Sequence, residues 1–164
     1  MAGRRNGLAV LVEALRTWLV PYRYGLERWS YTLQRISGVV ITLYFVAHIV
    51  ETGYVVGGPS VWTIRPDAQQ YAERVWTETI KFLSNPLFDA GLAIIGFFVA
   101  FHTINGIRLF LAHFGWGLGR PTRPEPMHRP QSMSPTQRAL FWASIAFAVF
   151  ALVYTTNAFF GVLA

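Results

Sequence analysis

One apolar stretch of the chain carries several side chains that could do chemistry. Residues 101–115 place His102, Arg108 and His113 among mostly apolar neighbours. Ionisable groups are costly inside a membrane, so each is a candidate for cofactor, ion or proton chemistry. A spacing of three or four residues puts one set on a single helical face: His102, Asn105 or Gly106, Leu109 and His113. Gly106, one turn after His102, would leave room for a flat, bulky group.

A further histidine lies in the preceding apolar segment, where Tyr44 and His48 are one helical turn apart and Glu51 follows. His48 and His102 could hydrogen-bond a neighbouring helix, ligate a haem iron, or serve in proton transfer or metal binding. Zinc is disfavoured because the sequence holds no cluster of three or four ligands. The absence of cysteine excludes thiolate haem ligation and cysteine-bound iron–sulfur clusters within the chain.

Composition predicts the elements that position these residues. The chain has 164 residues, of which 53% are hydrophobic and 13% charged. Three apolar runs, about 36–56, 87–112 and 139–163, are long enough to cross a bilayer. We therefore expect one all-α membrane domain over residues 1–164, with an amphipathic interfacial helix at about 7–20 and transmembrane helices at about 30–56, 87–114 and 137–163.

Smaller patterns refine this expectation. A second interfacial helix is predicted to start at Pro66–Asp67. In the second span, small residues predict close helix contacts: Gly91, Ala93, Gly96 and Ala100. The third span carries no charge from Ala139 onward, and it is expected to contribute only packing and lipid contact.

The net charge of +6 is distributed asymmetrically. Arginines are concentrated in residues 1–35 and 108–138, whereas the basic residues of 57–85 are balanced by acidic ones. This is the positive-inside pattern, so we expect a cytoplasmic N-terminus, an outer C-terminus and no nucleic-acid partner.

Depth separates the two membrane histidines. If Arg35 and Arg108 mark the inner boundary, His48 lies about 20 Å above it and His102 about 9 Å. The offset of about 10 Å is too large for two axial ligands of one iron, and it favours two haems at different depths. The arginines themselves could snorkel to lipid phosphates, or could bind haem propionates or a quinone carbonyl.

Two motifs then resemble the cytochrome b membrane-anchor subunit of succinate dehydrogenase (succinate:quinone oxidoreductase). Residues 34–38 read Gln-Arg-Ile-Ser-Gly, similar to the family's His-Arg-x-Ser/Thr-Gly. Residues 102–108 read His-Thr-Ile-Asn-Gly-Ile-Arg, similar to its His-x-x-x-Gly-Ile-Arg. The resemblance covers roughly residues 28–116 and includes order, spacing and orientation.

The resemblance implies roles for named residues. His102 would ligate haem b, and Arg108 would lie near its propionates. Arg35 would line a quinone pocket on the cytoplasmic side. His48 resembles the additional ligand of the two-haem class. The candidate iron ligands are His48 and His102. The full set of candidate cofactor-binding residues is His48, His102, Arg35, Arg108, Tyr44, Gly106, Ser37 and His113. The candidate quinone contacts are Arg35, Tyr31, Ser30 and Gln34.

The chain departs from the family pattern at a few positions. Gln34 replaces the histidine before the arginine, Tyr31 replaces a serine, and Leu109 replaces a frequent histidine. His113 stands where an aspartate is frequent.

The resemblance also implies partners and location. The partners are a flavoprotein with FAD, an iron–sulfur subunit and a second membrane anchor that shares the two haems. The complex is expected in the cytoplasmic membrane of a prokaryote, with lipid and quinone, and it could form a higher oligomer. No FAD or cluster motif occurs in this chain. The alternatives are a haem-free structural anchor, the equivalent fumarate reductase subunit, and a small transporter subunit. The last is disfavoured by the lack of a polar stripe in the third span.

Overall fold

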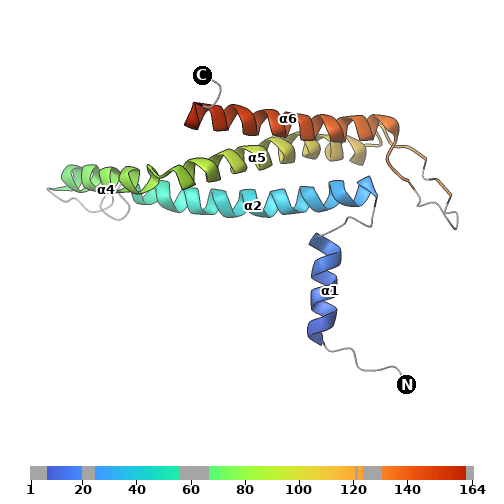
Figure 1. The fold of residues 1–164 in the computed structure, drawn as a ribbon, viewed down its shortest axis with the longest axis horizontal. Helices are drawn as coiled ribbons and strands as arrows, with labels where there is room; N and C mark the ends of the chain where they lie inside the picture. The colour runs from blue at the N-terminus through green and yellow to red at the C-terminus, as the bar shows by residue number, and fades with distance from the viewer. Residues whose placement is uncertain (1–6, 20–24, 56–66, 121, 124–130, 162–164) are drawn as a thin grey trace. The chain divides into compact units, whose positions relative to one another are not determined.

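The computed structural model describes residues 7–19, 25–55, 67–120, 122–123 and 131–161. They form five helices, which Figure 1 colours from blue to red along the chain. The helices are α1 (Gly7–Leu19), α2 (Leu26–Val55), α4 (Ala68–Leu83), α5 (Pro86–His113) and α6 (Pro135–Phe160). No strand occurs among the residues described, so the all-α prediction is confirmed.

Three of these helices are long and apolar enough to cross a membrane: α2, α5 and α6. At 1.5 Å per residue they are about 39–45 Å long, more than the hydrocarbon thickness of about 30 Å. The three predicted spans are therefore confirmed as helices. The start of α2 is four residues earlier than expected, because the carbonyl of Gly25 accepts the backbone N–H groups of Arg28 and Trp29. Both termini of the chain lie outside the described ranges. The predicted orientation, with a cytoplasmic N-terminus and an outer C-terminus, stays a prediction.

The chain divides into two compact units. The first comprises Met1–Ser37 and Phe101–Ile145, and the second comprises Gly38–Ala100 and Ala146–Ala164. Each of the three long helices contributes one part to each unit. The single domain predicted over residues 1–164 stays a prediction.

The first unit combines aromatic packing with buried polar groups. Phe101 of α5 and Phe141 of α6 are both buried, and their rings meet edge to face at 6.3 Å between centroids. The apolar residues Leu8, Leu11 and Leu15 of α1 are exposed. That exposure is what an interfacial helix requires, because its apolar face is covered by lipid rather than by protein.

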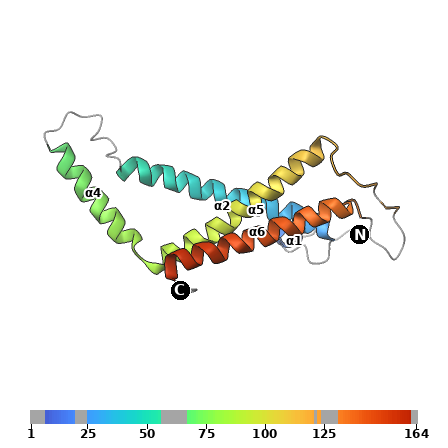
Figure 2. The ribbon, with the colours of Figure 1, turned by 90° about the horizontal axis from the view of Figure 1, so that it is seen from above.

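The second unit contains α4 and a close contact between α5 and α6. As predicted, α4 begins directly after Asp67. A break at Ser84 and Asn85 separates it from α5, as Figure 2 shows. A Cβ atom added to Gly96 of α5 would lie 3.4 Å from Cγ2 of Thr155 of α6. The predicted close helix contact at a small residue is therefore confirmed for Gly96. It is not found for Gly91, because nothing lies within 4 Å of a Cβ atom added there.

This contact makes Gly96 sensitive to side-chain size. Gly96→Ala should be tolerated, whereas Gly96→Leu should destabilise the protein by about 1–3 kcal/mol, because a leucine would overlap the space of Thr155. The melting temperature of the detergent-purified complex measures the effect. Gly91→Leu is the matched control, and equal melting temperatures for the two leucine variants would contradict the predicted contact.

Candidate functional site

A row of polar side chains is buried inside the first unit. Ser30 and Ser37 lie on one face of α2, seven residues apart, and Asn105 and Arg108 lie on one face of α5, three residues apart. Gln137 comes from the first turn of α6. None of the five is more than 4% exposed. Buried polar groups are costly unless they are hydrogen-bonded, so these side chains must serve as partners for one another.

Arg108 is the centre of this network. Its Nε donates to Oδ1 of Asn105 at 2.9 Å, and its Nη1 donates to Oε1 of Gln137 at 2.7 Å. Its Nη2 donates to Oγ of Ser30. The guanidinium group thus joins α2, α5 and α6, and all three of these acceptors are uncharged.

His102 lies beside this network, half-buried and bonded to α2 through both ring nitrogens. Its Nδ1 is 2.9 Å from Oγ of Ser37, and its Nε2 is 3.5 Å from Nε2 of Gln34. The amide of Gln34 also donates to the backbone carbonyl of His102 at 3.4 Å. Asn105 donates to Oε1 of Gln34 at 2.7 Å, which connects the histidine to Arg108.

The space predicted beside Gly106 is occupied by Gln34 in this structure. A Cβ atom on Gly106 would lie 3.4 Å from Nε2 of Gln34. The absence of a side chain at residue 106 therefore allows the amide to approach α5 next to His102.

The four candidate quinone contacts fall into two separate groups. Ser30 and Gln34 belong to the polar network inside the first unit. Arg35 and Tyr31 are exposed, and Nη1 of Arg35 donates to the Tyr31 hydroxyl at 2.7 Å with its guanidinium group 5.1 Å from the ring centre. Ser30 is buried and Gln34 is half-buried, whereas both residues of the second pair are exposed. The quinone role of all four residues stays a prediction.

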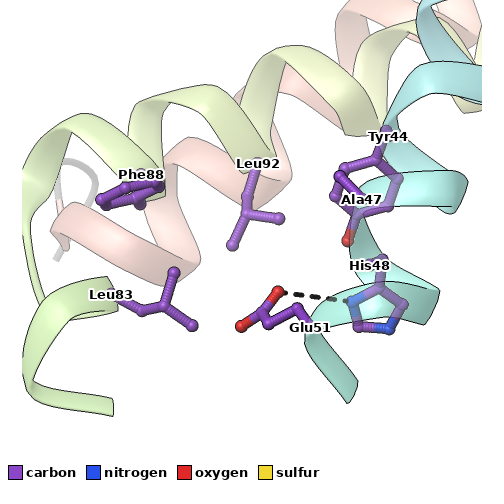
Figure 3. Close-up of a pocket in the computed structure, with 7 residues that line it drawn as sticks. All are labelled: Tyr44, Ala47, His48, Glu51, Leu83, Phe88 and Leu92. Carbon is purple, nitrogen blue, oxygen red and sulfur yellow. Dashed lines mark ion pairs between the residues drawn. The ribbon is translucent and has the colours of Figure 1, made fainter. Parts of the chain in front are cut away.

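A different cluster in the second unit contains the other membrane histidine. His48 stacks on Tyr44 at 5.6 Å between ring centroids, and its Nδ1 is 4.0 Å from Oε2 of Glu51. Figure 3 shows these α2 residues around a cavity of about 330 Å³. Ala47 of α2, Leu83 of α4, and Phe88 and Leu92 of α5 complete its lining.

The surroundings of His48 and His113 differ from those of His102. The side chain of His48 is 51% exposed, so one side of its ring is open. His113 is the last residue of α5 and is exposed, with its ring against Phe114. Leu109, placed by its spacing on the same face, is also exposed, and Arg108 is buried instead. The packed face of α5 therefore runs through residues 102, 105 and 108.

Sequence reasoning missed Gln137 as a site residue. The expectation that the third span contributes only packing is wrong for its first turn, where Gln137 accepts from Arg108 and donates to the carbonyl of Trp116. A signal was present in the sequence. Ser134 and Pro135 form an N-cap and first helical position, and Oγ of Ser134 accepts the Gln137 N–H at 3.2 Å. Gln137 is the third residue of this helix, and its hydrogen bond to the N-cap fixes the position of its backbone.

The fold and these buried polar groups define a helical membrane protein of several spans with an internal histidine–arginine site. A family model described as the succinate dehydrogenase/fumarate reductase transmembrane subunit matches residues 13–154. The chain belongs to this family, whose members are subunits of oxidoreductase complexes, and the resemblance carried by the two motifs is confirmed. Comparisons with curated proteins and with solved structures find no significant match.

The network predicts a stability effect at Gln137. Gln137→Leu should lower the free energy of unfolding by about 1–3 kcal/mol, because Nη1 of Arg108 would stay buried without this acceptor. The melting temperature of the purified complex is the measurement. Thr136→Val, at the exposed neighbouring position, should leave it unchanged. A Gln137→Leu protein with the melting temperature of the wild type would show that the contact between Gln137 and Arg108 does not contribute to stability.

Proposed function

We propose that this chain is the haem b-binding membrane anchor of a succinate dehydrogenase. It holds the flavoprotein and iron–sulfur subunits at the cytoplasmic face and helps electrons pass from succinate to membrane quinone. The observation that carries the proposal is the half-buried imidazole of His102, held by Ser37 and Gln34 in a chain of this family.

The residues around His102 fit an axial haem ligand. Iron-ligating histidines commonly bond their second ring nitrogen to a neighbouring acceptor, which orients the ring, and Ser37 occupies that position on Nδ1. The Nε2 atom faces only the long contact with the amide of Gln34. A haem bound there would supply one-electron redox chemistry, and His102 would be its ligand in this chain, oriented by Ser37.

Arg108 has a supporting part in this proposal. It is 4% exposed and already bonded to three side chains. These contacts favour a role in fixing the helices around His102 over a direct bond to the haem propionates.

A second haem at His48 is the further part of the proposal. The open side of the His48 ring and the carboxylate of Glu51 near its Nδ1 support it, since a carboxylate beside one ring nitrogen orients the other toward a metal. Tyr44 supports the ring from one side. The second anchor subunit would supply the remaining ligands of both irons.

Quinone would bind next to Arg35 and Tyr31. A guanidinium group is well suited to hydrogen-bond a carbonyl oxygen whose negative charge grows on reduction. The pair is exposed on α2 and therefore accessible to a membrane-soluble ligand. The N-terminus would lie in the cytoplasm, and the exposed apolar residues of α1 would rest on the same leaflet.

A haem-free structural anchor is the second candidate. The amide of Gln34 near Nε2 of His102 favours it, because that nitrogen already has a partner within the chain. The equivalent subunit of a fumarate reductase would have the same anchor chemistry with the reverse direction of electron flow.

Haem content separates the two candidates. The purified complex should contain two b haems, and His102→Ala and His48→Ala should each remove one of them, because the axial nitrogen is lost. The pyridine haemochrome assay counts them. His113→Ala is the control and should retain both. A complex without haem would establish the structural anchor, and loss on His102→Ala alone would leave His48 as a packing residue.

Arg35 tests the quinone site. Arg35→Leu should lower succinate–quinone activity about tenfold or more, because a charge-assisted hydrogen bond is lost. Arg35→Lys should recover it only in part, since lysine lacks the planar fork. Succinate oxidation with an artificial dye acceptor should persist. Arg120→Leu, an exposed arginine outside α2, serves as the control, and unchanged quinone activity in Arg35→Leu would assign Arg35 to lipid phosphate.

A further inference from the structure

In the chain of hydrogen bonds that leads from Arg108 to His102, each side chain donates to the next one. We propose that Arg108, Asn105, Gln34 and Ser37 are positioning residues that hold the neutral imidazole of His102 with its proton on Nδ1 and its electron pair on Nε2. The inference rests on the proposed haem ligation, and it identifies how the ligating nitrogen is kept ready.

The direction begins at Arg108, because a guanidinium group can only donate. The group of Asn105 that faces Nε of Arg108 must therefore be its oxygen, at 2.9 Å. This leaves the Asn105 amide nitrogen to donate to Oε1 of Gln34 at 2.7 Å. The orientation of each amide is thus determined by the one before it.

Gln34 is the last donor of this chain of hydrogen bonds, and it donates to His102. With its oxygen bound to Asn105, its NH₂ group faces the ring Nε2 and the backbone carbonyl of His102, at 3.5 and 3.4 Å. An amide NH₂ group only donates, so the ring Nε2 must be the acceptor and carry no proton.

Ser37 gives the same result from the opposite side of the ring. A serine hydroxyl has a single proton, and that of Ser37 is donated to the carbonyl of Gln34 at 3.0 Å. Its oxygen can then only accept from Nδ1 of His102, at 2.9 Å. Two independent partners therefore select the same tautomer.

The two bonds of the ring differ in strength in the way that a ligand site requires. The Nδ1 contact has ordinary hydrogen-bond length, whereas the Nε2 contact is longer than the usual 2.7–3.2 Å. The weak bond on Nε2 can be given up to an iron while the strong bond keeps the ring in place. Gln34 is thus a replaceable cap on the ligating nitrogen.

The test uses the complete complex and two measurements, haem per complex and the midpoint potential of the haem that is lost in His102→Ala. Ser37→Ala removes the acceptor of the Nδ1 proton. It should raise that potential, because the imidazole then donates less electron density to the iron, and it should weaken haem retention roughly tenfold or more. Ser37→Thr keeps the hydroxyl group and should match the wild type.

Asn105→Asp removes the group that donates to Gln34 without changing the shape of the side chain. An aspartate at this position accepts from Arg108 but cannot donate to Gln34, so the Gln34 amide should turn its oxygen toward Nε2 of His102. The expected result is a loss of haem from this site comparable to that of Ser37→Ala. Thr103→Val, at an exposed position of α5, is the control.

The outcomes separate this inference from the proposed function. A full wild-type haem content in His102→Ala would overturn the ligand assignment itself. If His102→Ala loses haem while Ser37→Ala and Asn105→Asp keep wild-type haem content and potential, the ligand assignment stands and the positioning network is overturned. If Ser37→Ala prevents assembly, Asn105→Asp decides the question by the same two measurements.

Discussion

The first unit depends on one constraint, which is that the guanidinium group of Arg108 is buried among apolar helices and must find acceptors there. No single helix can provide them all, because its own backbone carbonyls are used along its axis. The acceptors come from Ser30 of α2, Asn105 of α5 and Gln137 of α6, which lie up to 78 residues from Arg108 in sequence. Satisfying one side chain therefore brings three helices together.

The two membrane histidines have different electrostatic surroundings. His102 is bonded to neutral groups in a network that contains a buried cation, whereas His48 is half exposed and faces the carboxylate of Glu51. A cation nearby stabilises the reduced form of a redox centre, and an anion stabilises the oxidised form. Two haems in these surroundings would have separate potentials, with the higher one at His102.

Much of the apolar surface of the described helices is not covered within the chain. Leu43, Phe45 and Ile49 of α2 and Phe150 and Tyr154 of α6 are among the large exposed side chains. In water such a surface would aggregate, but in a bilayer it contacts lipid or the helices of another subunit. The distribution agrees with a family whose members are transmembrane subunits of larger complexes.

The sequence by itself determined the helical spans, the family and part of the face of α5 that carries the site. Hydropathy sets the number of spans, and helical periodicity places His102 with Asn105, but it placed the exposed Leu109 on that face in place of the buried Arg108. Periodicity cannot say which face meets which, because that depends on contacts between residues far apart in the chain. Only the tertiary structure decided that Gln137 binds Arg108, that Gln34 fills the space beside Gly106, and that Arg35 is exposed while its near neighbour Ser37 is buried. The physical reason is that a buried donor needs acceptors close to it in space. These acceptors lie far from it in sequence, so a pattern along the chain does not show which of them it will bind.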